Sequence, residues 1–226
     1  MIIYGKQLFL HILNKRPQIL EEIYLSKECD KKLFSKICGT GKKIIRVDNQ
    51  KAQSMAHGGN HQGFLASVSE FEFSDISELK KLNFIAVLYG ISDVGNIGAI
   101  ARSAYALGCK GLVIVTKSVN MQGVLRSSSG AAYEIPIAIF EDGLSLLNEL
   151  KQCGFRLYAT ASNGKNIKEM KFAGKRALVM GSEGEGIPQK ALAKCDECVG
   201  IKLKDGWDSL NVSAAFAIIC DRMIDE

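Results

Sequence analysis

The sequence predicts an α/β protein built on a parallel sheet, and two observations lead to this fold class. Residues 84–89 and 177–180 are continuous apolar runs, which are typical of parallel strands buried on both faces. Further apolar runs alternate with helical patterns as far as residue 223, and such alternation predicts a parallel sheet covered by helices. The chain has 226 residues, 47% of them apolar, which suits one large domain or two smaller ones.

The residues before 71 give a shorter and less regular pattern than those after 83. A helical stretch ends near Pro17, and the loop at 57–63 is polar and rich in glycine. Residues 71–82 are charged and lack strand spacing, so we expect them to link a first domain, residues 1–70, to a second, residues 83–226. The elements expected in the first domain after Pro17 are a strand at 22–25, a helix at 49–56 and a strand at 63–68. In the second domain we expect strands at 84–89, 111–115, 135–139, 155–160, 176–181 and 198–203, and helices at 96–107, 122–131, 142–152, 188–194 and 210–223.

The charge distribution favours an anionic partner. The net charge is +5, and most of the excess lies in residues 1–82, which contain thirteen Lys and Arg against nine Asp and Glu. Nucleic acid is the commonest partner of such a surface, and a merely solvated basic surface is the alternative. The first residues lack the charged start and apolar stretch of a signal peptide, and no apolar run has the length of a membrane span. We therefore expect a cytoplasmic protein.

The cysteines indicate a reducing compartment. There are seven, an odd number scattered through the chain, which does not suit a disulfide framework. Cys195 and Cys198 form a single CxxC pair, and a structural zinc site needs two more ligands. No second pair exists, so we expect no bound metal.

Three segments at predicted strand-to-helix junctions combine glycine with small polar residues. In the first, Arg102 follows Asn96 by six residues in an otherwise apolar helix, where an arginine must find a partner or leave the core. In the second, Glu183 lies between glycines, which let a backbone approach a ligand closely. The third is the run at 208–213 before the last helix. Each alone could be an exposed arginine, a turn or a helix N-cap, but together at one sheet edge they predict a ligand site.

The same segments match the ordered motifs of one family. The matches are Asn96-x-Gly98-x-x-x-Arg102, Gly181-x-Glu183-x-x-Gly186 and Ser209-Leu210-Asn211-Val212-Ser213. With them, residues 84–226 resemble the SpoU (TrmH-type) RNA 2′-O-ribose methyltransferases of the SPOUT superfamily. Tyr4-Gly5 and Asn60-His61-Gln62-Gly63 resemble the substrate-binding domain of the branch that modifies large-subunit rRNA. The resemblance implies a SPOUT parallel-sheet domain with a C-terminal trefoil knot, a preceding small L30e-like α/β domain, and a homodimer formed through the knotted domain.

The resemblance also implies roles for single residues. The implied cofactor is S-adenosylmethionine, whose methyl group passes to a ribose 2′-hydroxyl without a metal. The residues implied in catalysis are Arg102, Asn96, Glu183, Ser209 and Asn211. Those implied in cofactor binding are Gly181, Ile201, Leu210, Thr160, Ala161 and Ser213, and those implied in RNA binding are Arg102, His61 and Gln62.

The expected function is therefore methylation of structured RNA, with a guanosine of 23S rRNA as the favoured target. A tRNA substrate and an RNA-binding protein without catalytic activity are the alternatives. A dinucleotide-dependent oxidoreductase is disfavoured because the GxGxxG fingerprint is absent. A guanidinium stays protonated in proteins, so we expect Arg102 to hold a phosphate and stabilise a developing alkoxide rather than act as a base. No histidine follows residue 61 to activate Ser209, which argues against a covalent nucleophile.

Overall fold

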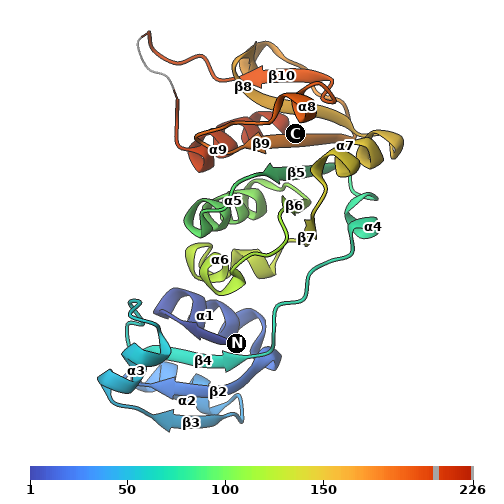
Figure 1. Ribbon diagram of the computed structural model, residues 1–226. Coiled ribbons are helices and arrows are strands. Elements are labelled where there is room, and N and C mark those ends of the chain that lie inside the picture. Colours follow the sequence, from blue (N-terminus) through green and yellow to red (C-terminus); the bar gives the residue numbers. More distant parts are fainter. Residues whose placement is uncertain (206–208, 225–226) are drawn as a thin grey trace.

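The computed structural model describes residues 1–205 and 209–224, and it contains two separate sheets (Figure 1). Asp208, the first residue of the third motif segment, lies outside the described residues. The N-terminal sheet has four strands in the order β1-β4-β2-β3, in which β2 and β3 are parallel and β4 is antiparallel to its neighbours. The elements of this part are β1 (Ile2–Tyr4), α1 (Lys6–Lys15), η1 (Pro17–Ile19), β2 (Leu20–Leu25), α2 (Lys31–Cys38), β3 (Lys43–Arg46), α3 (Asn49–Met55) and β4 (Phe64–Val68).

The C-terminal sheet has six strands in the order β10-β8-β9-β5-β6-β7, and every neighbouring pair is parallel. The parallel α/β sheet predicted from the apolar runs is therefore confirmed. Its elements follow α4 (Ile76–Leu79) and are β5 (Phe84–Tyr89), α5 (Val94–Leu107), β6 (Gly111–Val115), α6 (Met121–Ser127), η2 (Ala131–Tyr133), β7 (Ile137–Phe140), α7 (Gly143–Gln152), β8 (Arg156–Asn166), η3 (Ile167–Glu169), β9 (Arg176–Gly181), α8 (Gln189–Leu192), β10 (Glu197–Gly200) and α9 (Val212–Met223).

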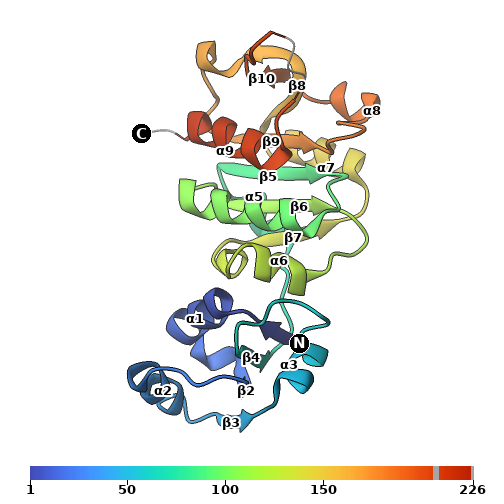
Figure 2. The same ribbon diagram turned by 90° about the vertical axis from the view of Figure 1, so that its left-hand side faces the viewer.

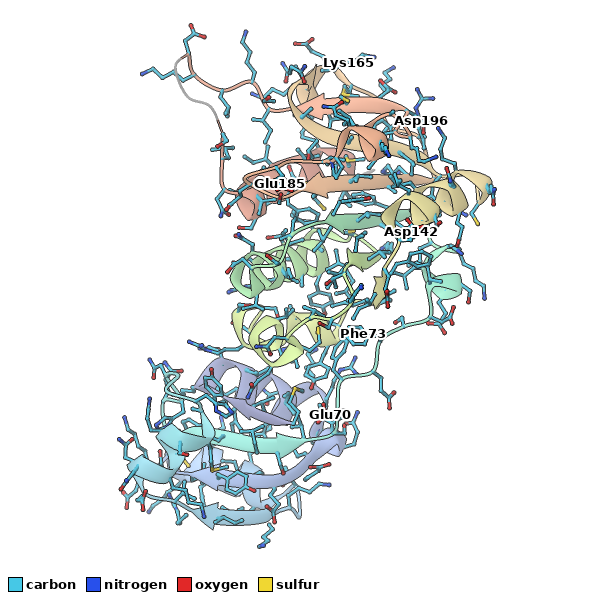
Figure 3. The ribbon with its side chains drawn as sticks, viewed as in Figure 1. Glu70, Phe73, Asp142, Lys165, Glu185 and Asp196 are labelled. Carbon is cyan, nitrogen blue, oxygen red and sulfur yellow. The ribbon has the colours of Figure 1, made fainter. Side chains whose placement is uncertain are left out.

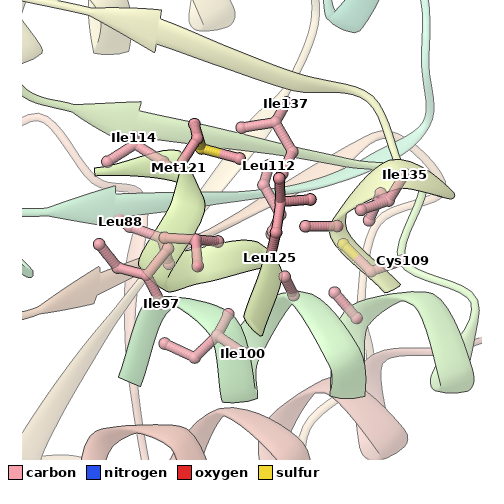
Figure 4. Packing of buried hydrophobic residues seen from close by; sticks show 14 of the residues in the cluster. Leu88, Ile97, Ile100, Cys109, Leu112, Ile114, Met121, Leu125, Ile135 and Ile137 are labelled. Atoms are coloured by element: carbon pink, nitrogen blue, oxygen red, sulfur yellow. The ribbon is translucent and has the colours of Figure 1, made fainter. Parts of the chain in front are cut away.

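Helices cover both faces of this sheet (Figures 1 and 2). Alternate side chains of β5 point to opposite faces: Leu88 belongs to the apolar cluster of α5, α6 and α9, whereas Val87 belongs to that of α7 and α8. Figure 4 shows Leu88 beside Ile97 and Ile100 of α5. Because both faces are buried, the strand sequence is apolar throughout, and this is why it was recognisable.

The last helix is fixed at its C-terminal end by a buried arginine. Arg176, at the start of β9, is only 3% exposed. Its guanidinium donates hydrogen bonds to the carbonyls of Ala173 and Gly174, both at 3.1 Å, and to that of Met223 at the end of α9. It also lies 4.9 Å from the ring centroid of Phe84. A buried guanidinium needs such partners, and here they join β9 to α9.

Several predicted boundaries were wrong, most of all in β8 and β10. β8 continues six residues beyond the predicted end, to Asn166, because β10 pairs with it twice, at Tyr158–Ala159 and again at Lys165–Asn166. The backbones touch here: a Cβ on Gly164 would lie 2.4 Å from the carbonyl carbon of Val199. β10 correspondingly ends at Gly200 rather than at 203. The polar residues of this β8 extension carry no strand pattern, so the sequence did not indicate it.

Two strands and two α-helices, all short, were not predicted: β1, β3, α2 and α4. Asp30 caps α2 and Asp75 caps α4, each through a side-chain oxygen that accepts a hydrogen bond from a backbone N–H. Only Ile37 of α2 is buried, so its helical pattern is faint. α4 occupies part of the charged segment 71–82.

One contact between the N-terminal part and the C-terminal sheet is centred on Glu134, next to η2. Glu134 Oε1 lies 3.0 Å from His11 Nε2 and accepts a hydrogen bond of 3.2 Å from Arg16 Nε. Arg16 also donates to the Tyr133 carbonyl and stacks over the Tyr133 ring. We call His11, Arg16, Tyr133 and Glu134 the Glu134 junction. In another contact between these two parts, Arg126 of α6 donates to the hydroxyl of Tyr4 at 3.2 Å.

Candidate active site

The three motif segments meet at one edge of the C-terminal sheet. Asn96 lies in the first turn of α5, after β5; Glu183 follows β9; and Asn211 is the residue before α9. Asn211 Nδ2 donates to Asn96 Oδ1 at 2.9 Å and to Glu183 Oε1 at 2.8 Å. We call Asn96, Glu183 and Asn211 the amide cluster. The convergence expected for strand ends of a parallel sheet is therefore present for these three residues.

Both helix starts at this edge are capped. Asp93 accepts a hydrogen bond of 2.7 Å from the Asn96 backbone N–H, and Asn211 Oδ1 accepts one of 3.0 Å from the Ser213 N–H. Glu183 Oε1 accepts a further bond of 3.2 Å from the Val212 N–H. A carboxylate at a helix N-terminus is favourable because it satisfies a free donor and opposes the helix dipole. The predicted N-cap and the predicted site are thus one structure at Asn211.

A pocket of about 510 Å³ lies beside the amide cluster. We call it the β9 pocket. Five of the six residues implied in cofactor binding line it, and these are Thr160, Ala161, Gly181, Ile201 and Leu210. Glu183 and Ser209, implied in catalysis, line it as well. The sixth, Ser213, is not among the lining residues; its N–H and hydroxyl instead bind Asn211 Oδ1.

The lining of the β9 pocket carries negative charge, and two of its backbone segments lie in close contact. Glu183 and Glu185 contribute two carboxylates, and no Lys or Arg is among the described residues that line it. Figure 3 shows Glu185 on the same side of the sheet as α9, away from Asp142 and Asp196. Gly181 permits a close backbone contact, since a Cβ there would lie 2.4 Å from the carbonyl carbon of Gly186. Such a pocket suits a positively charged ligand held partly by main-chain groups.

Arg102 belongs to neither arrangement. It lies on α5, its side chain is exposed, and it forms no hydrogen bond or ion pair with any residue in the described part of the chain. An exposed cation without a protein partner is available to an anionic ligand.

Comparison with known proteins identifies the family. The model of the SpoU rRNA Methylase family matches residues 83–221. The chain belongs to this family. A second model, RNA 2′-O ribose methyltransferase substrate binding, matches residues 2–74 of the SpoU protein. The family resemblance seen in the three motifs is therefore confirmed, and with it the assignment as an S-adenosylmethionine-dependent RNA 2′-O-ribose methyltransferase.

Relatives match the SpoU protein over nearly its whole length. The 23S rRNA (guanosine-2′-O-)-methyltransferase RlmB of Yersinia pestis is 30% identical over 230 residues, which are 96% of this chain and 94% of that protein. The protein of the same name from Pasteurella multocida is 31% identical, with the same shares covered.

Solved structures show the same fold. AviRb, a SpoU methyltransferase from Streptomyces viridochromogenes in complex with AdoMet, has a TM-score of 0.79 and 21% identity over 98% of this chain and 88% of that one. An AdoMet-bound rRNA methyltransferase from Sinorhizobium meliloti has a TM-score of 0.77 and 19% identity over 98% and 85% of the two chains.

The two N-terminal residues implied in RNA binding differ in exposure in the SpoU protein. His61 is 5% exposed, and its Nδ1 accepts a hydrogen bond of 3.1 Å from the Gly63 N–H, so its ring supports the loop. Gln62 is exposed and has a left-handed backbone, with φ at 52°. Its Oε1 accepts a hydrogen bond of 3.0 Å from the Lys6 N–H at the start of α1, and its amide N–H groups bind none of the described residues.

Three residues that shape the site were not singled out in the sequence. Asp93 caps α5, Glu185 lines the β9 pocket, and Ser182 Oγ accepts a hydrogen bond of 3.4 Å from the Glu185 N–H. Asp three residues before Asn96 was a readable N-cap signal. Ser182 and Glu185 had no comparable signal beyond their place in the glycine loop.

The cysteines take no part in this site. All seven are free thiols, and burial raises the pKa of Cys195 to about 12, which keeps it an unreactive thiol. No three His, Cys, Asp or Glu side chains gather into a possible metal site within residues 1–205 and 209–224. Among the described helices, none has the length and apolar character needed to cross a membrane.

Proposed function

We propose that this SpoU enzyme methylates the ribose 2′-hydroxyl of a guanosine in 23S rRNA. One observation carries the proposal: Glu183 both lines the β9 pocket and binds Asn211, so the place for the cofactor adjoins the amide cluster. The relatives that match along almost the whole chain are named as 23S rRNA guanosine methyltransferases, which favours rRNA over tRNA.

S-adenosylmethionine, when bound, supplies an activated methyl group on a positively charged sulfur. The β9 pocket fits it, because the lining carries two carboxylates and backbone groups brought close by glycine. We expect main-chain groups at Gly181, Ile201 and Leu210 to hold it, with Thr160 and Ala161 at the wall. Ser209, which is exposed and lines the pocket, is expected to contact the RNA.

Arg102 is the residue that we expect to matter most for the chemistry. The 2′-hydroxyl must lose its proton as it attacks, and the negative charge that develops on its oxygen needs a fixed cation or donor. Arg102 is exposed and has no partner among the described residues, so its guanidinium can bind an RNA phosphate and stabilise that oxygen. A guanidinium has five N–H donors and no acceptor, so the proton of the hydroxyl leaves by another route.

The N-terminal part is proposed to bind the RNA around the target. We propose residues 1–70 as this domain, 71–82 as the linker and 83–226 as the catalytic domain. The match of residues 2–74 to a substrate-binding model supports this division. Gln62 is the expected contact, with His61 supporting its loop.

We also propose a homodimer through the knotted domain. α5 and α9 contact each other, and each leaves a large apolar side chain exposed, Tyr105 at 47% and Ile218 at 43%. Such side chains on adjacent helices suit a subunit interface. The trefoil knot remains a prediction, supported by the close backbone contacts of Gly164 and Gly200. Light scattering should report a dimer for the wild type and monomers for Ile218→Lys.

Free cysteines and an rRNA substrate support a cytoplasmic location. The decisive experiment maps 2′-O-methylation in 23S rRNA and tRNA from cells with and without this protein. We expect one guanosine of 23S rRNA to lose its methyl group. Loss of a methyl group from tRNA instead would show that tRNA is the substrate. An unchanged methylation map, together with no calorimetric binding of S-adenosylmethionine, would show a binding protein without activity.

A further inference from the structure

The side chain of Asn211 uses all of its hydrogen-bonding capacity. Its Nδ2 donates to Asn96 Oδ1 and Glu183 Oε1, and its Oδ1 accepts from the N–H of Ser213 at 3.0 Å and from the Ser213 hydroxyl. An amide has two N–H donors and two acceptor lone pairs, so nothing is left over for a ligand. Asn211 therefore acts inside the protein, as a fixed connection between α9 and α5.

The orientation of this amide is dictated by its neighbours. The backbone N–H of Ser213 can only donate, so it must face Oδ1 of Asn211. Glu183 Oε1 already accepts from the Val212 N–H, and a carboxylate oxygen accepts but does not donate. A flipped amide would put two donors together at Ser213 and two acceptors together at Glu183. The chemistry of the partners thus settles which atom is nitrogen.

The orientation of the Asn211 amide also fixes that of the Asn96 amide. Its Oδ1 is taken by Asn211 Nδ2, so its own Nδ2 is the end that faces away. That nitrogen carries two N–H donors and binds none of the residues that the structure describes. Asn96 is half-buried in the first turn of α5, where its backbone is held by the Asp93 cap. The side chain is thus pinned at its oxygen and open at its nitrogen.

We propose that Asn96 serves as a dedicated hydrogen-bond donor to an oxygen of the RNA at the target nucleotide. In this proposal Ser213 is a positioning residue, because its hydroxyl and its N–H together hold the Asn211 amide against Asn96 and Glu183. The resemblance placed Ser213 beside the cofactor, whereas its hydrogen bonds place it behind Asn211. The inference rests on the proposed RNA methylation. The oxygen is either a phosphate oxygen or the 2′-oxygen itself, and kinetics distinguish them.

Asn96→Asp is the sharpest test, since it keeps the shape and leaves an acceptor facing Asn211 while replacing the outward donor by an acceptor. Asn96→Ala removes both. We expect methylation of a 23S rRNA transcript by the full chain to fall about tenfold in Asn96→Ala, from loss of one donor, and about 100-fold in Asn96→Asp, from added repulsion. If Asn96 only holds Asn211, the order reverses: Asn96→Asp stays near wild type and Asn96→Ala is worse. That reversed order would overturn the proposal.

Ser213 gives a second, independent arm. Ser213→Ala removes the hydroxyl that helps to hold Asn211 and should lower the rate several-fold, and Ser213→Thr should restore most of that loss. Adding Ser213→Ala to Asn96→Asp should cause little further loss, because Asn96 then no longer has the donor that Ser213 helps to position. Additive losses in the double variant would show that Ser213 does not act through Asn211 and Asn96. Asn148→Asp on α7, which covers the opposite face of the sheet, adds the same charge and serves as the control.

Two readouts separate failure of this proposal from failure of the proposed function. Calorimetry should give unchanged S-adenosylmethionine affinity for the Asn96 variants, which shows that they fold. A loss confined to KM for RNA assigns the oxygen to a phosphate, and one confined to kcat assigns it to the 2′-oxygen, whose charge grows during reaction. If the wild type itself methylates no rRNA, the proposed function fails first.

Discussion

The Glu134 junction and the amide cluster are both polar networks around one carboxylate, yet they are built in opposite ways. At the junction, Glu134 meets His11 and Arg16, and Arg16 is further engaged by the Tyr133 carbonyl and ring. In the amide cluster, Glu183 meets only uncharged donors, while Arg102, a cation on the same helix as Asn96, has no partner within the described residues. At the junction the charged side chains are paired, although the buried Tyr133 hydroxyl has no hydrogen-bond partner, whereas at the site Arg102 and the Asn96 Nδ2 group bind none of the described residues.

The two networks therefore differ in whether their cation is paired within the protein, and this distinguishes a structural network from one that can receive a ligand. A network that holds two parts of a chain together lowers the free energy of the folded state most when every group is satisfied. A network that receives a ligand must leave groups to be satisfied later. Substitutions at the junction should therefore change stability, and those at the site should change catalysis.

The largest expected effect is at Arg102. Arg102→Ala should lower kcat for RNA methylation by roughly 10² to 10³, the usual cost of removing a group that stabilises transition-state charge. Arg102→Lys should also lose more than about tenfold, because an ammonium cannot bind a phosphate in bidentate fashion. The melting temperature should stay unchanged for both. Lys190→Ala, an exposed cation on α8, is the control, and near-wild-type kinetics of Arg102→Lys would contradict a bidentate clamp.

The next effect concerns the junction. Glu134 is only 18% exposed, and Glu134→Gln removes its charge while keeping its size. Unfolding in urea should show a loss of about 1–2 kcal/mol, because two charge-assisted hydrogen bonds weaken together. S-adenosylmethionine affinity should not change. Glu141→Gln, a change at an exposed residue after β7, is the control and should alter neither the stability nor the cofactor affinity. A loss of cofactor binding in Glu134→Gln would contradict a purely structural role for the junction.

The same carboxylate gives a smaller, pH-dependent effect. Burial raises the pKa of Glu134, but hydrogen bonds from His11 and Arg16 outweigh it and hold the pKa below the ordinary value of 4.5. A depressed pKa stabilises the folded state above the ordinary value, and the contribution is lost as the pH falls through the folded-state pKa. The stability difference between wild type and Glu134→Gln should therefore be fully present above about pH 4.5 and shrink as the pH falls below that value. A difference independent of pH would contradict this account.

The smallest effect should come from Arg126, which lies over the Tyr4 ring at 5.1 Å and donates to its hydroxyl. Arg126→Gln should cost about 0.5–1 kcal/mol, the usual worth of an exposed cation–π pair. Cleavage of the 71–82 segment by a protease should become faster. Arg46→Gln removes a similar stack on Phe34 within the N-terminal part, and it should leave that cleavage rate unchanged.

What the sequence could predict depended on whether one segment carried the signal by itself. The central strands were predictable because burial on both faces makes them apolar throughout. The strand-end site was predictable because Asn96, Glu183 and Asn211 stand out beside glycine and apolar residues. The end of β8 was not, because its polar residues form a strand only through the second pairing with β10. The direction of the hydrogen bonds through Ser213 was equally hidden, since it depends on three segments meeting in space.

The late position of α9 in the chain has a consequence for the order in which the site is assembled during synthesis. α9 is the last element of the chain as described, and its start supplies Asn211 while Leu210, just before it, lines the β9 pocket. Every strand of the sheet emerges from the ribosome before these residues do. A nascent chain that has folded its sheet thus still lacks one wall of the pocket and the centre of the amide cluster. The enzyme therefore becomes able to act on RNA only after residues 210–223 have been synthesised and have packed onto the sheet.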